Sequence, residues 1–348
     1  MSTHKITKII IEKYLQNWIL DCDSFISPQS KNLKIHNLKK IGGSVNSVYS
    51  FTLLYDIEKQ NKRLGLILKL FSPSEKQRKI CEREYGILTY LQKRNFPVPI
   101  VHILETDESF LGGPFMIMKR VEGKSIASYL KHNKKKNSEI IKQLAKVLAL
   151  LHAIEIDKVQ LGFLEIPENE YSYAKKSSLV KSSLDYSKHW NYNWVTRWLE
   201  MNVKSCPCET YSLLHFDSNL KNFIISEQGI IFVVDWEWAE VGDAIRDVAC
   251  AYQETSYNLG LNTATLFLKY YETFSKRKIT RAKLNFYLVV SGLNLALYNR
   301  LLSTKNMGTE YLIRLFGKKI SPLFPLLRWY FRRKYKRLEK NLRNIVTT

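Results

Sequence analysis

The part of the chain that most constrains its fold is the run from residue 213 to residue 247. Two short apolar segments, Tyr211–Leu214 and Ile230–Val234, have the composition of buried strands. Polar residues lie between these segments and directly after the second one: His215, Asp217, Asn222 and Asp235. Charged and amide side chains at the ends of apolar strands are typical of a functional site on a rigid scaffold.

These polar residues have a structural and a chemical interpretation. Asp and Asn are common in turns because their side chains bond the nearby backbone, and each of them alone fits that role. As a set they also provide what phosphoryl transfer requires. One carboxylate can take the proton of an attacking hydroxyl, and further oxygen atoms can ligate the magnesium ion on ATP.

The order of these residues resembles the pattern of the aminoglycoside-phosphotransferase and choline-kinase superfamily. In that pattern, H-G-D-x-x-x-x-N is followed by a strand, by D-[FW]-E and by G-D-x-x-x-D-[LV]-A. The corresponding blocks here are His215-Phe216-Asp217, Asn222, Asp235-Trp236-Glu237, Gly242-Asp243 and Asp247-Val248-Ala249. The resemblance extends over about residues 38–302 and implies an α+β fold of the protein-kinase type, with ATP in the cleft between two lobes.

The resemblance predicts an N-terminal lobe of residues 1–118, with an opening helix, a small antiparallel β-sheet and a nucleotide loop. Residues 119–348 then form a larger, mainly helical lobe with the catalytic loop and a basic C-terminal tail. The segment that joins the lobes is the expected hinge. The resemblance implies that Met118, Lys119 and Val121 contact the adenine there.

A glycine pair between two predicted strands has two interpretations. Gly-Gly between strands is common in hairpin turns. Glycine also lets backbone N–H groups approach phosphate oxygens closely, and a serine hydroxyl adds a donor. The superfamily has G-G-x-x-N-x-x-Y at this place, so the resemblance assigns nucleotide binding to Gly42, Gly43, Ser44 and Asn46.

Lys69 is the single charge in an apolar strand over residues 64–71. A buried lysine without an anionic partner is costly, so we expect an acidic partner. The alternative is a lysine of an edge strand that points to solvent. The resemblance implies that Lys69 contacts the α- and β-phosphates of ATP and pairs with a helix glutamate. On a helix predicted over residues 74–94, we expect this acid to be Glu84, with Glu82 as the second choice.

The resemblance also assigns the catalytic roles. Asp217 is the expected base, His215 supports its loop, and Asn222 and Asp235 are the expected magnesium ligands. Three more acidic residues are expected as loop braces or near the metal: Asp243, Asp247 and Glu237. Phe216 replaces the superfamily's usual glycine, which adds bulk beside the base and weakens any inference about the acceptor.

The composition is that of an ordinary globular protein, with 45% hydrophobic and 25% charged residues in a chain of 348. Charged residues interrupt the first twenty positions, which excludes a secretory signal, and no apolar run is long enough for a transmembrane helix. The five cysteines have no framework spacing, which favours a reduced, cytoplasmic compartment. Cys206-Pro207-Cys208 alone is a weak candidate for a metal or redox site.

The net charge of +22 favours anionic partners. Residues 328–343 contain eight basic residues with Trp and Tyr, and such a helix either packs on its own domain or makes a weak contact with an anionic membrane surface. The aromatic residues between 186 and 198 likewise fit either a core or a pocket for a quaternary ammonium group.

The sequence therefore predicts a cytoplasmic kinase that uses ATP and magnesium to phosphorylate a hydroxyl of a small molecule. Amino alcohols, sugars, homoserine and antibiotics are the candidate acceptors, because the D-F-G and A-P-E segments of protein kinases are absent. The alternative is a nucleotide-binding pseudokinase or scaffold, against which the presence of Lys69, Asp217, Asn222 and Asp235 argues. Without a recognised nucleic-acid-binding module, we expect no specific nucleic-acid partner.

Overall fold

The computed structural model describes residues 8–15, 29–42, 46–132, 137–157, 160–179, 192–304 and 324–347. The chain forms two compact units. One consists of Met1–Lys124 and Ile224–Glu237, and the other of Ser125–Phe223 and Trp238–Thr348. None of the described helices is both long enough and apolar enough to span a membrane.

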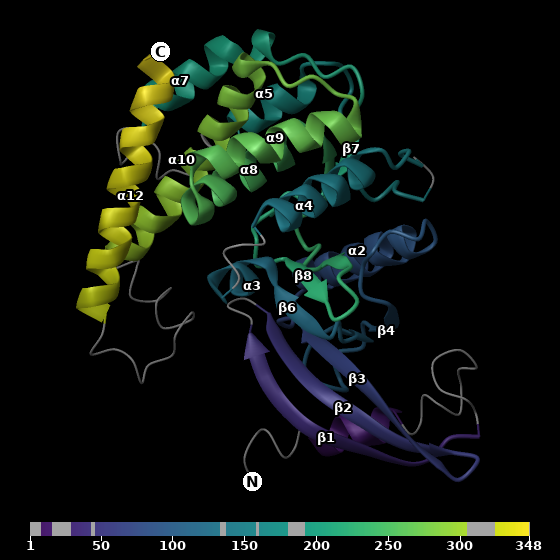
Figure 1. Ribbon diagram of the computed structural model, residues 1–348. Coiled ribbons are helices and arrows are strands. Elements are labelled where there is room, and N and C mark those ends of the chain that lie inside the picture. The colour runs from purple at the N-terminus through teal and green to yellow at the C-terminus, as the bar shows by residue number, and fades with distance from the viewer. Residues whose placement is uncertain are drawn as a thin grey trace. The chain divides into compact units, whose positions relative to one another are not determined.

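The first unit is built on a five-stranded antiparallel sheet with the order β1-β2-β3-β5-β4 (Figure 1). Its strands are β1 (Lys31–Gly42), β2 (Ser47–Ile57), β3 (Gln60–Leu70), β4 (Val101–Glu105) and β5 (Phe115–Lys119). Strands β2 and β3 are joined by a two-residue turn in which Glu58 and Lys59 both have positive φ, at 49° and 64°. Two such residues match the right-handed twist of the hairpin, and β3 begins at Gln60, four residues before the strand predicted over residues 64–71.

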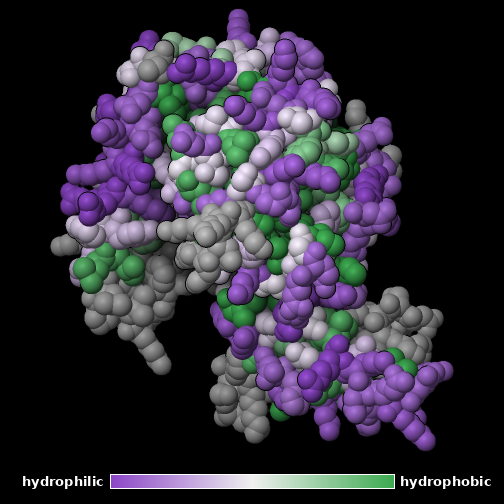
Figure 2. All heavy atoms as spheres, in the orientation of Figure 1, coloured by the Kyte–Doolittle hydropathy of each residue, from purple (hydrophilic) through white to green (hydrophobic). Residues whose placement is uncertain are grey.

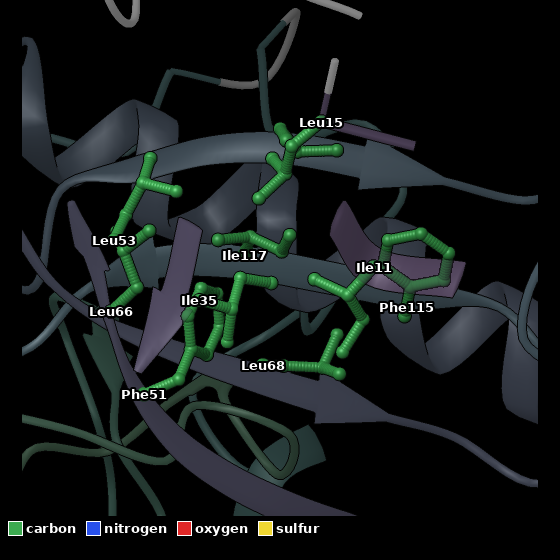
Figure 3. Packing of buried hydrophobic residues seen from close by; sticks show 10 residues of the cluster. Ile11, Leu15, Ile35, Phe51, Leu53, Leu66, Leu68, Phe115 and Ile117 are labelled. Carbon is green, nitrogen blue, oxygen red and sulfur yellow. The ribbon is translucent and has the colours of Figure 1, made fainter. Parts of the chain in front are cut away.

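The two faces of this sheet have different partners. Apolar side chains of one face pack with the helix at residues 8–15, and Figure 3 shows them in contact. The fully buried members of this cluster include Ile11, Leu15, Ile35, Phe51, Leu53, Leu66, Leu68, Phe115 and Ile117. Successive strand residues point to opposite faces. Lys69 therefore points to the other face, which it shares with its partners Val48 and Met116.

Helix α2 (Glu75–Gln92) belongs to the same unit as this sheet. Ser74 caps the helix by accepting a hydrogen bond from the backbone N–H of Gln77.

A second sheet, β6-β8-β9, consists of β6 (Gly123–Ser125), β8 (Phe223–Ser226) and β9 (Ile231–Val233). The sequence placed the lobe boundary after residue 118. The first unit continues to Lys124 and takes up Ile224–Glu237, because β8 pairs with β6 and β9 pairs with β8.

The second unit is mainly helical. Its elements are α3 (Ile126–His132), α4 (Asn137–His152), α5 (Ser172–Leu179), α7 (Asn193–Asn202), the 3₁₀ turn η2 (Val203–Ser205), β7 (Ser212–Leu214), β10 (Glu240–Gly242), α8 (Ile245–Leu259), α9 (Leu261–Ser275), α10 (Arg281–Ser303) and α12 (Phe324–Thr347). Helix α9 packs between α4 and α8, and α10 packs between α8 and α12 (Figure 1). Strands β7 and β10 form an antiparallel pair within this unit. The sheet and the helices together confirm the α+β class predicted from the sequence.

We expect Leu68→Ala to lower the free energy of unfolding by about 2–5 kcal/mol, because it leaves a cavity in the cluster on the sheet's apolar face. Chemical denaturation would measure this change. Lys34→Ala, an exposed position on β1, is the control and should change stability by less than about 0.5 kcal/mol. Equal effects of the two substitutions would contradict the assignment of the core.

Candidate functional site

Lys69 of β3 is surrounded by carboxylates. Its side chain is 7% exposed, and its Nζ lies 2.8 Å from Glu84 Oε2, 2.7 Å from Asp235 Oδ1 and 3.4 Å from Glu237 Oε2. Strand β3 lies in the middle of its sheet, so the interpretation of Lys69 as an edge-strand lysine is wrong. Burial favours the neutral amine, but the three carboxylates outweigh it and raise the pKa of Lys69, which therefore stays protonated.

Glu84 is the helix residue that meets Lys69, whereas Glu82 is exposed. The Glu84 side chain is 1% exposed and also accepts a hydrogen bond from the backbone N–H of Trp236, at 3.1 Å. Burial raises the pKa of Glu84, and the charge of Lys69 opposes this rise. Trp236 is fully buried, with its indole N–H donated to the carbonyl of Val233. One carboxylate thus fixes both the lysine and the segment that carries Asp235.

Asp235 and Glu237 differ in exposure and in partners. The Asp235 side chain is 44% exposed, and its backbone has a φ of 68°. Glu237 is only 20% exposed and accepts a hydrogen bond from Asn46 Nδ2 at 3.0 Å, while its carbonyl accepts one from Arg83. Asn46 directly precedes β2, so Glu237 links this end of the predicted nucleotide loop to Lys69. Gly42 ends β1, and Gly43 and Ser44 lie outside the described residues.

A groove of about 670 Å³ opens on the first unit. It is lined by Asn37, Leu38, Lys39, Ile41, Ser50, Thr52, Arg120 and Glu122. Ser50 pairs with Ile67, and Ile67 lies two residues before Lys69 on β3. The side chains of Ser50 and Lys69 therefore point to the same face of the sheet. Arg120 lies across this face, because its guanidinium donates to Ser50 Oγ at 3.0 Å and to Glu122 Oε1 at 2.7 Å. Sequence reasoning missed this arginine, since nothing in the local pattern distinguishes it from a surface residue.

The predicted hinge residues border this region. Met118 is buried and pairs with Ile67, and Val121 is half-buried. The backbone N–H of Lys119 donates to Ile100 at 2.7 Å, and that of Arg120 donates to the carbonyl of Gly65 at 2.8 Å. These two N–H groups are therefore already used within the unit.

In the second unit, Asp217 lies in a loop that is held together by the amide side chains of two asparagines of the same loop. Asn219 Nδ2 donates to Asp217 Oδ1 at 2.9 Å, and Asn222 Nδ2 donates to Asp217 Oδ2 at 3.0 Å. The nitrogen of Asn222 also donates to the carbonyl of Asp217, so its amide oxygen is the atom left to serve as a ligand. Asp217 is half-buried and Lys221 is exposed. Asn219 was missed by the sequence analysis, although an Asn two residues after an Asp is a common turn signal.

Asp247 organises the backbone on the other side of Asp217. Its two carboxylate oxygens accept the backbone N–H groups of His215, at 2.7 Å, and Phe216, at 2.8 Å. His152 Nε2 lies 3.4 Å from the same carboxylate, and His152 Nδ1 lies 2.8 Å from the hydroxyl of Tyr271. Burial alone would raise the pKa of Asp247, but the two histidines and the backbone donor outweigh it and hold the pKa below its usual value. His215 and His152 are both interior residues.

Phe216 has a φ of 70°, in the left-handed region that glycine adopts without strain. This explains why the superfamily pattern has glycine at the position. The guanidinium of Arg246 lies 4.5 Å from the centre of the Phe216 ring, and Arg246 is itself held by Ser291 at 2.8 Å. The ring contact and the hydrogen bond to Asp247 together hold phenylalanine in a backbone conformation that it rarely adopts.

Two more groups surround the loop. Glu254 of α8 is a second acid near Asp217: burial raises its pKa and Asp217 raises it further, whereas Lys334 and Lys221 lower it. Asp243 pairs with Lys283 at 2.8 Å and accepts the N–H of Ile245 at the start of α8.

Of the remaining sequence candidates, the described cysteines and aromatic residues make contacts within the chain. Cys206 and Cys208 are free thiols, and burial raises their pKa to about 11 and about 12, so neither is a reactive thiolate. Tyr186 and Trp190 lie outside the described residues. The rings of Tyr192 and Trp194 face arginines of the chain itself, with Arg300 at 5.7 Å and Arg343 at 4.8 Å.

The two predicted magnesium ligands belong to different units, Asp235 to the first and Asn222 to the second. Among the residues that the structure describes, no cluster of three or more His, Cys, Asp or Glu side chains could hold a metal ion by itself. Magnesium on ATP needs fewer protein ligands, because phosphate oxygens and water supply the others. Asp235 offers an exposed carboxylate, and Asn222 offers an amide oxygen.

The family model described as "Phosphotransferase enzyme family" matches residues 44–287. Among curated proteins, the chain is 26% identical over 208 residues to a probable acyl-CoA dehydrogenase, IBR3, of Arabidopsis thaliana. That match covers 52% of this chain but only 23% of the relative, so the chain spans about a quarter of that protein's length.

Two solved structures show the same fold. The choline kinase LicA from Streptococcus pneumoniae has a TM-score of 0.58 at 18% identity, with 96% of this chain and 99% of the kinase covered. A thermostable mutant of the aminoglycoside phosphotransferase APH(4)-Ia, in ternary complex with ADP and hygromycin B, has a TM-score of 0.57 at 16% identity. The coverage there is 88% of this chain and 97% of the other. These likenesses confirm the predicted two-lobed, protein-kinase-like fold.

We expect Asp247→Asn to lower the free energy of unfolding by about 3 kcal/mol at neutral pH, since one of the two backbone donors then faces an amide NH₂. The pKa of Asp247 is depressed in the folded protein, so its contribution is complete above the unfolded value of about 3.9 and is lost as the pH falls through the folded value. Denaturation from pH 7 to pH 3 should show the two proteins converging in acid. A difference that does not depend on pH would contradict this account.

Two substitutions at Phe216 separate backbone strain from ring packing. Both Phe216→Ala and Phe216→Gly remove the contact with Arg246, but only glycine adopts the positive φ without cost. We therefore expect the glycine variant to be more stable than the alanine variant by about 1 kcal/mol in urea denaturation. The opposite order would show that the backbone is not strained at this position.

Proposed function

Because the chain belongs to the phosphotransferase enzyme family, we propose that it is a small-molecule kinase that transfers the γ-phosphoryl group of ATP to a hydroxyl of its acceptor. The observation that carries the proposal is the set of three carboxylates around the buried ammonium of Lys69. A lysine held in this way is a fixed positive charge for phosphate oxygens, and an exposed carboxylate beside it is a ligand for their cation.

The nucleotide is proposed to bind on the Lys69 face of the first unit. Gly42, Gly43, Ser44 and Asn46 would contact the phosphates, and Lys69 would contact them as well, positioned by Glu84. Met118 and Lys119 would border the adenine, with the backbone N–H of Val121 as a donor to the ring, since the N–H groups of Lys119 and Arg120 are used elsewhere. The bound ADP of the APH(4)-Ia complex supports this choice of nucleotide.

Asp217 is the proposed base. Asn219 and Asn222 each donate to one of its oxygens, which fixes the carboxylate's orientation. Asp217 accepts the proton of the acceptor hydroxyl as that oxygen bonds to the γ-phosphorus. The bond from the γ-phosphorus to the β,γ-bridging oxygen breaks, and ADP leaves with that oxygen. Asp247 holds the backbone of the loop in place by accepting the N–H groups of His215 and Phe216, and the interior His215 is proposed to support the loop from within.

Asn222 and Asp235 are proposed to hold magnesium. When bound, the ion neutralises charge on the phosphates during transfer. Asp235 can serve this purpose because its carboxylate is exposed, whereas Glu84 is buried against Lys69. Glu237 acts through Lys69 and Asn46 and is proposed as a positioning residue.

The acceptor is proposed to be an amino alcohol, a sugar, homoserine or an antibiotic. The choline kinase and the hygromycin B complex among the similar structures support small acceptors with hydroxyl groups. ATP as the phosphoryl donor and free thiols at Cys81, Cys206, Cys208 and Cys250 support a cytoplasmic location.

The test of this function is ATP consumption by the purified protein with magnesium across a panel of these acceptors. We expect one acceptor class to stimulate turnover by the wild-type protein. This stimulation should be absent in Asp217→Ala. If ATP binds and no acceptor stimulates turnover, the nucleotide-binding scaffold becomes the better account.

Asp217→Ala should leave ATP binding unchanged and lower turnover by about 10²–10⁴-fold, the usual contribution of a general base. Glu227→Ala, an exposed acid of the next turn, serves as the control and should behave as wild type. Unchanged turnover in Asp217→Ala would remove this residue from the reaction.

Asp235→Ala should abolish the magnesium dependence of nucleotide binding, because it removes the exposed carboxylate beside Lys69. Calorimetric titration with ATP, with and without magnesium, measures this directly. If magnesium still strengthens ATP binding to the variant, Asp235 is not a ligand.

A further inference from the structure

Helix α12 has one buried face and one exposed face of different chemistry. Leu338 and Leu342 are 5% and 1% exposed and lie on the side that packs against α10. The fit is close there, since a Cβ built on Gly292 of α10 would lie 3.0 Å from Leu342 Cδ2. Asn341 and Arg337 meet Tyr257 of α8, with Asn341 Nδ2 at 3.2 Å from its hydroxyl. These contacts anchor the helix to its own unit.

The exposed face of α12 is basic. Its exposed basic residues are Arg332, Arg333, Lys334, Lys336, Lys340 and Arg343, and Arg337 is exposed as well although its guanidinium contacts the Tyr257 ring. The only acid of the helix is Glu339, which is 27% exposed and pairs with Arg343 at 3.1 Å. Figure 2 shows mainly hydrophilic residues along the margin that α12 occupies in Figure 1, with hydrophobic atoms near the N-terminal end of the helix. Such a surface attracts anions along most of its length of about 36 Å.

Three large apolar or aromatic side chains are exposed on the same helix. Leu326 is 65% exposed, Trp329 is 56% exposed and Tyr330 is 49% exposed. Arg333 lies 4.8 Å from the Trp329 ring and Lys334 lies 5.6 Å from the Tyr330 ring, so cations and aromatic rings alternate on this surface. Exposed Trp and Leu are the side chains that enter the headgroup region where a protein surface lies on a bilayer, and neighbouring Lys and Arg add attraction to anionic lipids.

We propose that the exposed face of α12 binds the surface of an anionic lipid bilayer, with Trp329 and Leu326 entering the headgroup region. The charge of the face is complementary to acidic headgroups. Nucleic acid would satisfy the same charges, but an exposed leucine gains nothing from a phosphate backbone, whereas it does gain from a bilayer. This proposal is independent of the reaction proposed for Asp217.

The test is sedimentation of the full chain with vesicles of phosphatidylcholine alone and of phosphatidylcholine with about 30% phosphatidylserine. The expected result is binding to the anionic vesicles, lost at high salt, and at least about tenfold weaker binding to the neutral ones. Each basic residue near an anionic surface contributes about fivefold to binding. Lys336→Glu with Lys340→Glu should therefore weaken binding by about 25-fold or more, since each substitution also introduces a repelled charge.

The matched control is Lys142→Glu with Lys146→Glu, two exposed lysines with the same spacing on α4. It should leave vesicle binding within about twofold of wild type, and circular dichroism should show that both double variants are folded. Trp329→Ala should weaken binding to the anionic vesicles relative to wild type, and this difference between the two proteins should persist when salt is added, because salt screens charges and not apolar contacts. Equal loss in the two lysine pairs would overturn the proposal in favour of attraction by net charge. Displacement of the vesicles by an equal charge of RNA at physiological salt would overturn it in favour of nucleic acid.

Discussion

One buried ammonium, that of Lys69, joins three segments of the first unit. Lys69 can be buried because Glu84 of α2 and the segment of Asp235 and Glu237 reach it together. Breaking a buried pair by removing one partner usually costs about 3–5 kcal/mol. The strand, the helix and the segment after β9 are therefore held to a common geometry, and that geometry leaves Asp235 as the exposed carboxylate beside a fixed positive charge.

A second buried carboxylate, that of Asp247, fixes a backbone segment by accepting its N–H groups, as Glu84 fixes the ammonium of Lys69. Asp247 is fully buried and accepts the N–H groups of His215 and Phe216, just before Asp217. The loop is thus fixed from α8 on one side and by Asn219 and Asn222 on the other. Both units use a buried acid to hold an exposed or half-buried acid in place, Asp235 in the first unit and Asp217 in the second. A fixed orientation suits the metal ligand and the base that we propose for these two residues.

The sequence predicted the apolar strand that carries Lys69, together with the α+β class. A lone charge in an apolar strand predicted an acidic partner for Lys69, and the resemblance identified this partner as a helix glutamate. The sequence analysis missed β8 and β10, which are only four and three residues long, and it also missed the amphipathic helix α8. It also missed Arg120, Asn219 and Glu254, because their roles arise from contacts that local sequence does not encode.

The proposed reaction transfers the γ-phosphoryl group of ATP to a hydroxyl of the acceptor. Phosphorus NMR of the protein with magnesium, ATP and the stimulating acceptor identifies the product. We expect a phosphomonoester signal that grows in step with ADP as the γ-phosphate signal declines. Orthophosphate as the sole new signal would contradict it, since the protein would then transfer the group to water.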